Sequence, residues 1–168
     1  MLTFQKLTKE NYPDVLNIKH ELFPESNSDD DYVNYFDGKV KSNYYLVLKD
    51  ETPCATIGWY EFDEENAFVG WFGVVPDCQG QGMGGQALSF IIEEVKSLGY
   101  SYLRVYTDKV VNAVSLKLYD KFFELKEDYT YPDKIGATNN FVIYTKSFNG
   151  IEDKWNNRPL GEDDNYEL

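Results

Sequence analysis

Histidine and cysteine are scarce in this chain, and their scarcity excludes several kinds of site. The 168 residues include one histidine, His20, and two cysteines, Cys54 and Cys78. Zinc sites are built mainly from several histidines and cysteines, and a Ser-His-Asp triad needs a histidine beside its nucleophile. We therefore expect no metal site. Two cysteines do not make a disulfide framework, so we expect reduced thiols and a cytoplasmic protein.

The chain also has no long apolar run, and it has fewer basic than acidic residues. No stretch reaches the length of a membrane span, and residues 1–6 lack the charged-then-apolar order of a signal peptide. The 16 Lys and Arg residues are outnumbered by 29 Asp and Glu residues, which gives a net charge of −13. A surface of this charge repels nucleic-acid phosphates. We expect neither a membrane nor a nucleic-acid partner, and the charge favours a cationic ligand.

The length suits one domain with a sizeable core, and the hydrophobic periodicity predicts mixed secondary structure. Short polar turns between residues 44 and 75 predict an antiparallel meander. A helix separates the next strand from that meander, so those two strands should be parallel. The predicted strands cover 2–7, 44–48, 54–62, 67–75, 100–107, 124–131 and 140–147, and the predicted helices cover 13–22, 30–41, 86–98 and 112–122.

The glycine-rich stretch over residues 73–86 links an apolar strand to a helix. The start of the helix carries few side chains, because residues 80, 82, 84 and 85 are glycine. Unpaired amides and the helix dipole at such a position attract anions. The stretch therefore predicts a cradle for a phosphate-bearing cofactor.

Three motifs compete for this loop. A Walker A loop needs Lys and then Ser or Thr after its last glycine, but Gly85 and Gln86 follow Gly84. A dinucleotide fingerprint is formally present at Gly80, Gly82 and Gly85, yet in that fold the first glycine follows the strand directly, and here residues 76–79 intervene. The third motif is V-x-P-x-x-Q-x-x-G-x-G, which begins at Val74.

The third motif resembles motif A of the GNAT superfamily, the acyl-CoA-dependent N-acyltransferases. A second match supports the resemblance. Asn112, Ser115, Leu118 and Tyr119 follow the family pattern N-x-x-A-x-x-L-Y, with serine in place of the small alanine. The glycine that the family places after this helix is absent, because Phe123 follows Phe122. The two motifs lie in the expected order, and the resemblance covers about residues 2–147.

The resemblance implies a single mixed α/β domain. Its central sheet should be mostly antiparallel, with one parallel, splayed strand pair and flanking helices, over residues 1–148. Gly70 and Gly73 interrupt the strand before the loop, as in a β-bulge. Residues 149–168 are acidic and poor in apolar side chains, so we expect a loosely held tail in which Trp155 docks locally.

The resemblance also implies acetyl-CoA as co-substrate, without a metal. The pyrophosphate should lie on the loop amides and the pantetheine arm in the opening beside the bulged strand. Asn112 should hydrogen-bond the pantetheine amides. The expected cofactor-binding residues are Gly73, Val74, Val75, Gln79, Gly80, Gln81, Gly82, Met83, Gly84, Gly85, Asn112 and Ser115. Lys109, Lys117 and Lys121 are further candidates for the phosphates.

Acyl transfer needs a neutral amine, a polarised carbonyl and a protonated leaving thiolate. A backbone N–H near Val74 should polarise the carbonyl, and Tyr119 should protonate the departing sulfur. Glu61 is the expected general base, with Asp63 or a water chain as alternatives. The expected acceptor is a small-molecule or peptide amine, and an exposed sheet edge would allow a homodimer. Two other functions stay open: a nucleotide-dependent oxidoreductase and a non-catalytic CoA-binding module.

Overall fold

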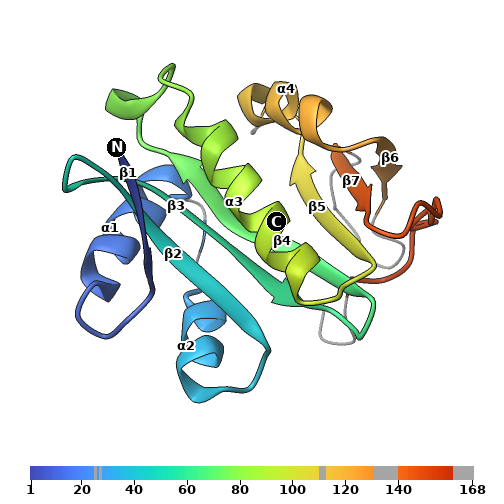
Figure 1. Cartoon of the computed structure of the whole chain (residues 1–168), viewed down its shortest axis with the longest axis horizontal. Coiled ribbons are helices and arrows are strands. Elements are labelled where there is room, and N and C mark those ends of the chain that lie inside the picture. Colours follow the sequence, from blue (N-terminus) through green and yellow to red (C-terminus); the bar gives the residue numbers. More distant parts are fainter. Residues whose placement is uncertain (25, 27, 110–112, 131–139, 161–168) are drawn as a thin grey trace.

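A computed structural model of the chain describes residues 1–24, 26, 28–109, 113–130 and 140–160. A mixed sheet with helices on both faces forms the molecule (Figure 1). The elements are β1 (Leu2–Lys6), α1 (Tyr12–Leu22), α2 (Asp30–Asp37), β2 (Ser42–Lys49), β3 (Thr52–Glu61), β4 (Asn66–Val74), the 3₁₀ turn η1 (Pro76–Cys78), α3 (Met83–Ser97), β5 (Tyr102–Asp108), α4 (Ala113–Phe122), β6 (Leu125–Tyr129) and β7 (Phe141–Ser147).

The seven strands lie in the order β1-β2-β3-β4-β5-β7-β6. The meander from β2 to β4 is antiparallel, and β4 pairs with β5 in parallel, as the sequence predicts. The β2–β3 turn holds two residues, Asp50 and Glu51, with φ of 49° and 69°, and positive φ at both central positions is the geometry of a type I′ hairpin turn. The predicted mixed α/β fold is confirmed.

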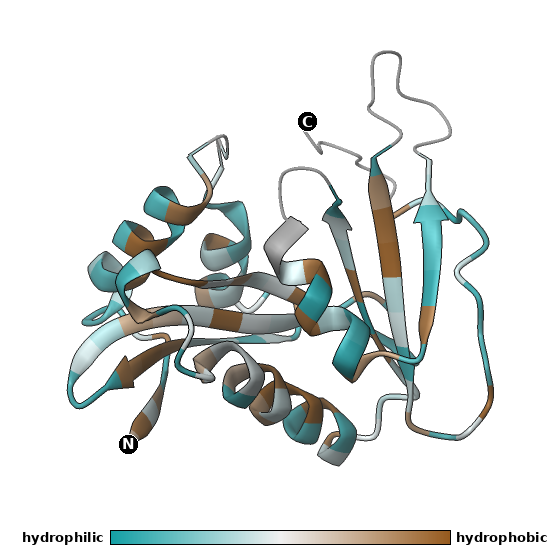
Figure 2. Ribbon diagram, turned by 90° about the horizontal axis from the view of Figure 1, so that it is seen from above, coloured by the Kyte–Doolittle hydropathy of each residue, from teal (hydrophilic) through white to brown (hydrophobic). Residues whose placement is uncertain are grey.

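Side chains of alternate residues supply cores on both faces of the sheet. Along β2, Tyr45 and Val47 belong to the core under α3, whereas Tyr44 and Leu46 belong to the core under α1 and α2. This two-residue period is the normal geometry of a strand. Figure 2 shows α1 and α2 on one side of the sheet and α3 on the other, with the apolar stripe of α3 facing the strands.

The parallel pair of strands separates soon after it begins. β4 and β5 are paired only at Asn66–Tyr102, Ala67–Leu103 and Phe68–Arg104. β4 then continues to Val74 and β5 to Asp108 without further pairing between them. Figure 2 shows the two halves of the sheet running in clearly different directions beyond this point. The splayed pair predicted from the resemblance is therefore present.

A β-bulge lies in the half of β4 that pairs with β3 but not with β5. Gly58 pairs with Gly70 and Thr56 pairs with Gly73, so Trp71 and Phe72 stand opposite one residue of β3. Trp71 has a φ of 44°, which is strained for a bulky residue. The bulge expected from Gly70 and Gly73 thus falls on the two residues between them. Gly73 lies close to α1: a Cβ there would lie 2.6 Å from Leu22 Cδ1, so a larger residue would displace the end of the Leu22 side chain.

The described part of the acidic C-terminal segment is packed, contrary to the expectation of a loosely held tail. Trp155 and Leu160 are buried in a core with Phe68 and Phe141. Arg104 of β5 is fully buried and forms an ion pair with Asp153. The local docking expected for Trp155 is present, but the buried cation that also holds the segment lies in a distant strand and was not predicted. Residues 161–168, and residues 131–139 between the strands predicted at 124–131 and 140–147, lie outside the described residues.

Candidate functional site

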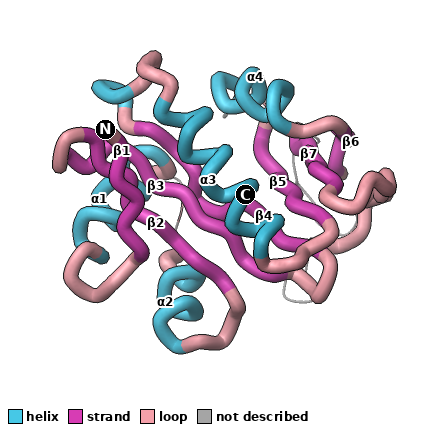
Figure 3. Tube along the Cα trace, in the orientation of Figure 1, coloured by secondary structure: helices cyan, strands magenta, loops and turns pink. Residues whose placement is uncertain are grey.

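The glycine-rich loop joins the bulged strand to the N-terminus of α3 (Figure 3). Gly80 and Gly82 have φ of 77° and 78°, a conformation that favours glycine. Gly82 is the N-cap of α3, which has no capping side chain and no acidic residue in its first turn among the residues described. The first amides of the helix therefore have no acceptor within the helix and carry the positive end of the helix dipole.

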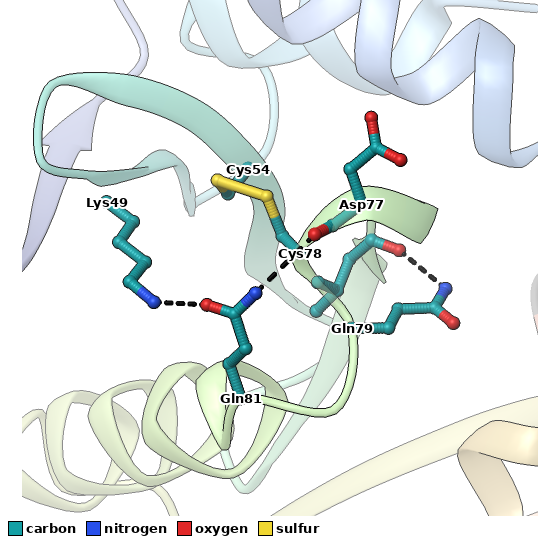
Figure 4. Close-up of a disulfide and its surroundings, with 7 residues drawn as sticks. Lys49, Cys54, Asp77, Cys78, Gln79 and Gln81 are labelled. Atoms are coloured by element: carbon teal, nitrogen blue, oxygen red, sulfur yellow. Dashed lines mark hydrogen bonds between the residues drawn. A yellow bond between two sulfur atoms is a disulfide. The ribbon is translucent and has the colours of Figure 1, made fainter.

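The two glutamines of the loop shape its backbone with their side chains. Gln79 Nε2 donates a 2.9 Å hydrogen bond to the carbonyl oxygen of Val74. Gln81 accepts a hydrogen bond from Lys49 Nζ and donates one to the carbonyl of Asp77, and Figure 4 shows these contacts around the loop. The predicted cofactor residues Gln79 and Gln81 thus brace the loop through their side chains, and the backbone N–H of Gln79 donates to the carbonyl of Pro76.

Lys49 is a cation at this loop that the sequence did not indicate. It lies at the end of β2, more than thirty residues before Gln81, so only the antiparallel pairing of β2 and β3 brings it there. Lys109, one of the predicted phosphate ligands, instead forms a 3.0 Å ion pair with Asp128. Lys117 and Lys121 are exposed on α4. A lysine beside bare amides is the usual supplement to an anion site.

Cys54 and Cys78 form a disulfide, and the expectation of two free thiols is wrong in this structure. Their Cα atoms are 5.8 Å apart although 24 residues separate them in sequence. The bridge joins β3 to η1, immediately before the loop (Figure 4). Val75 also donates its backbone N–H to the carbonyl of Cys54. The strand-to-loop junction is therefore fixed by one covalent bond and one hydrogen bond.

Beyond Phe68, the edge of β4 that faces the gap between β4 and β5 is not paired with β5, and the carbonyl of Val74 there accepts a hydrogen bond from Gln79 Nε2. Val75 donates its N–H toward β3, so the N–H of Val74 points to the opposite side, into the gap, because successive amides of a strand alternate in direction. Gly84 allows close packing at this place: a Cβ there would lie 3.1 Å from Leu118 Cδ2 and 3.6 Å from Phe72 Cζ. The loop, β4 and α4 converge beside the gap.

Tyr119 of α4 lies against the bulge, on the α3 side of the sheet. Its ring centroid is 6.2 Å from that of Phe72, and the side chain is buried. Burial raises the pKa of Tyr119 above its usual range, and nearby Tyr144 adds to this. The phenol therefore keeps its proton at every physiological pH. Ser115 lies one turn earlier on α4, and Asn112 lies outside the described residues.

A cavity of about 310 Å³ lies on the other face of the sheet. Asp31 of α2, Tyr44 of β2, and Tyr60 and Glu61 of β3 form part of its wall, and Leu160 of the docked C-terminal segment closes one side. Glu61 accepts a 2.8 Å hydrogen bond from the Tyr100 hydroxyl. The predicted base, Glu61, thus lies at the rim of this cavity, with its carboxylate turned toward Tyr100 of the α3 core. Asp31, which lies there too, was not singled out from the sequence, because an acid at a helix start is ordinarily read as a helix-dipole partner.

Asp31 connects the cavity to the bulge. Its Oδ2 accepts a 2.8 Å hydrogen bond from Trp71 Nε1. On the same Trp71 ring lies the ammonium of the fully buried Lys19, 4.2 Å from the centroid, and Phe23 packs edge-on at 5.2 Å. These contacts hold a strained residue in place, which is a common arrangement at functional sites.

Two further properties of the described residues bear on function. They contain no group of three or more His, Cys, Asp or Glu side chains arranged to hold a metal ion. None of their helices has the length and apolarity needed to cross a membrane.

The fold and the site define a mixed α/β domain with a splayed strand pair and a glycine-rich loop at the N-terminus of α3. The model of the acetyltransferase (GNAT) family matches residues 12–124. The chain belongs to this family and is an acyl-CoA-dependent acetyltransferase. A search of curated protein sequences finds no match.

Solved structures share the fold at low sequence identity. A GNAT family acetyltransferase from Elizabethkingia anophelis with acetyl-CoA bound is 20% identical, with a TM-score of 0.65 over 87% of this chain and 97% of that one. Arabidopsis thaliana Naa50, in complex with the bisubstrate analogue CoA-Ac-MVNAL, is 15% identical, with a TM-score of 0.69 over 87% and 98%. YncA from Salmonella typhimurium, with acetyl-CoA, is 14% identical, with a TM-score of 0.71 over 92% and 98%.

Proposed function

We propose that the protein transfers acetyl from acetyl-CoA directly to a primary amine, in a ternary complex without an acyl-enzyme. The observation that carries this proposal is the early end of the β4–β5 pairing at Phe68 and Arg104 beside an uncapped helix N-terminus. The opened strand edge suits an extended arm with amide groups, and the loop suits a pyrophosphate. Acetyl-CoA bound to structurally similar proteins supports the same assignment.

The proposed cofactor residues follow from this placement. The backbone amides of residues 80–85 would hold the pyrophosphate, Gln79 would brace their loop, and Gly73, Val74 and Val75 would line the arm. Ser115 and Asn112, at the start of the α4 region, would contact the pantetheine. Lys49 would add a positive charge beside the phosphates, since it already contacts Gln81.

The chain's own groups suit the transfer step. The Val74 N–H would donate to the thioester oxygen and stabilise the negative charge that develops there. The amine nitrogen forms a bond to the carbonyl carbon as the carbon–sulfur bond breaks. Tyr119, protonated because burial raises its pKa, would give its proton to the departing sulfur and recover one from the amine nitrogen. Glu61, whose carboxylate accepts a hydrogen bond from Tyr100, would take the proton of an incoming ammonium.

The acceptor side of the proposal includes several expectations from the sequence. A small-molecule or peptide amine is expected, and a cationic one is favoured by the net charge of −13. A homodimer through a sheet edge remains a prediction, as does the absence of a metal. We propose a cytoplasmic location, because acetyl-CoA is produced inside cells. In a reducing compartment the Cys54–Cys78 disulfide would be open to exchange with cellular thiols.

The proposal is tested by a thermal-shift titration with acetyl-CoA and with NAD, followed by thiol release with a panel of amines. We expect stabilisation by acetyl-CoA alone, since a ligand of the native state raises the melting temperature. Stabilisation by NAD alone would support an oxidoreductase and overturn the proposal. Binding of acetyl-CoA without turnover of any amine would favour a non-catalytic module.

Tyr119→Phe tests the proposed acid. We expect kcat to fall by about 10²-fold, the typical contribution of a general acid, with an unchanged dissociation constant for acetyl-CoA. Tyr144→Phe is a matched control, because its ring lies 5.5 Å from that of Tyr119 but its hydroxyl donates to Asp120. Equal losses in the two variants would contradict a specific role for Tyr119.

A further inference from the structure

Trp71, the first residue of the bulge, has its backbone and its side chain fixed by two different elements. Its φ of 44° is a left-handed conformation, which a bulky residue adopts only where the surrounding contacts outweigh the strain. The Trp71 carbonyl accepts a 2.9 Å hydrogen bond from Thr56 Oγ1 of β3. The indole Nε1 donates a 2.8 Å hydrogen bond to Asp31 Oδ2 of α2. The bulge is therefore held within the sheet by β3 and from outside the sheet by α2.

Helix α1 also packs against Trp71. The ammonium of the fully buried Lys19 lies 4.2 Å from the centroid of the indole, and cation–π attraction favours this position. Lys19 is held in turn by a 2.6 Å ion pair with Asp29, the N-cap of α2. The Phe23 ring packs edge-on against the indole at 5.2 Å. The start of α2 thus supplies both carboxylates that organise this ring, Asp29 through Lys19 and Asp31 directly.

The residue after Trp71 carries the geometry of the bulge to the other face of the sheet. Trp71 belongs to the core under α1 and α2, and Phe72 to the core under α3. The Phe72 ring lies 6.2 Å from that of Tyr119, and its Cζ would lie 3.6 Å from a Cβ on Gly84. Val74 follows two residues later, about 7 Å along the strand. A change in the Trp71 backbone would therefore move the strand edge relative to the proposed acid and the proposed oxyanion donor.

We propose that Asp31 is a positioning residue of the acetyl transfer, which acts through Trp71. Its hydrogen bond holds the bulge in the conformation that directs the edge of β4 at the reacting centre. This inference rests on the proposed function. The phosphate end of the site is held separately, by the Cys54–Cys78 disulfide and by the hydrogen bond from Val75 to Cys54. Loss of the Asp31 contact should therefore disturb the transfer step more than the binding of acetyl-CoA, since small misplacements of reacting groups are costly in rate.

Single variants of α2 test the hydrogen bond. Asp31→Ala removes the acceptor of the Trp71 N–H, whereas Asp31→Asn keeps an acceptor oxygen and loses only the charge. Asp30→Ala is the matched control, because it makes the same change at the neighbouring exposed position. In thiol-release assays with the amine that reacts fastest in the panel, we expect Asp31→Ala to lower kcat about tenfold and to leave the dissociation constant of acetyl-CoA unchanged. Asp31→Asn and Asp30→Ala should resemble the wild type. A normal kcat in Asp31→Ala, or an equal loss in Asp31→Asn, would overturn the proposal.

A double-variant cycle tests whether Asp31 acts through Trp71. Trp71→Phe keeps an aromatic ring beside Lys19 and removes the indole N–H. The two single variants should show similar losses of kcat, and Asp31→Ala/Trp71→Phe should lose no more than either one, because residues that act through one contact are not additive. Losses that multiply would refute a common route. A lowered melting temperature with unchanged kcat at 25 °C would show a purely structural role, which would also refute the proposal.

Hydrogen exchange gives a readout that needs neither an acceptor nor acetyl-CoA. The backbone amides of residues 71–74 should exchange about tenfold faster in Asp31→Ala than in the wild type, because the bulge opens more readily, and Asp31→Asn should restore slow exchange. Equal exchange in Asp31→Ala, Asp30→Ala and the wild type would contradict the proposal. If acetyl-CoA fails to bind to the wild type, the proposed function fails, whereas normal binding and turnover with unaffected variants refute only this inference.

Discussion

The disulfide between Cys54 and Cys78 provides a quantitative test of how the loop is held. The bond closes a loop of 24 residues between β3 and η1. In the chain-entropy model, a crosslink over a loop of this length stabilises the native state by about 3.5 kcal/mol at 25 °C, because it restricts the unfolded chain. Reduction should therefore lower the free energy of unfolding by about that amount.

Urea denaturation of the oxidised protein and of protein treated with a phosphine reductant measures this difference. For a urea m-value of about 2 kcal/mol/M, the midpoint should fall by about 1.5 to 2 M. The double variant Cys54→Ser/Cys78→Ser should unfold like the reduced protein and should not respond to the reductant. A thiol titration under denaturing conditions should find no free thiol in the oxidised protein.

Reduction should also weaken acetyl-CoA binding severalfold, because the junction before the loop is then held only by the Val75–Cys54 hydrogen bond. A phosphine is used because a thiol reductant would exchange with the thioester. Coincident urea transitions with and without reductant, or two titratable thiols in the untreated protein, would refute this reasoning.

Three stability predictions follow from buried groups. Asp29→Asn should destabilise the fold by about 3 kcal/mol, because it leaves the buried ammonium of Lys19 without its 2.6 Å partner. Burial tends to raise the pKa of Asp29, but hydrogen bonding to Lys19 and His20 lowers it overall. The stabilisation from the Asp29 carboxylate is therefore present above about pH 4 and is lost as the pH falls further. A melting temperature that stays constant from pH 7 to pH 2 would contradict this. The pKa of Asp31 is raised, so its contribution is favourable at low pH and is lost as the pH rises, and Asp31→Asn should melt at the same or a higher temperature than the wild type at pH 7. Gly58→Ala should fail to fold or lose about 3 kcal/mol, because its Cβ would lie 2.7 Å from the backbone oxygen of Asn43; normal urea unfolding would show that the packing is wrong.

Local patterns predicted the elements, and the resemblance predicted the opening of the sheet. Helix α2 ends earlier than expected, at Asp37, because Gly38 adopts a left-handed C-cap with φ of 67°. Helix α3 begins at Met83, three residues before the predicted start. The prediction was late because Gly84 and Gly85 occupy the first turn, and glycine is a poor helix former. Periodicity alone gave no sign that β4 and β5 part after Phe68.

Long-range proximity is what the sequence did not reveal. Cys54 and Cys78 meet because β3 pairs with the end of β4. Lys49 reaches Gln81 because β2 pairs with β3. From the sequence, Asp31 is an ordinary acidic residue at the start of a helix, and only the structure shows its contact with Trp71. The docking of residues 149–160 includes an ion pair with the buried Arg104. Composition alone would place an arginine at the surface.

A crystal structure with coenzyme A tests the central claim most directly, namely that the parted strands and the loop form one cofactor site. We expect the pyrophosphate oxygens within hydrogen-bond distance of the backbone amides of residues 80–85, and the pantetheine arm along the edge of β4 that is not paired with β5, up to Val74. Coenzyme A bound elsewhere, or β4 and β5 paired along their whole length with no room for the arm, would contradict the claim.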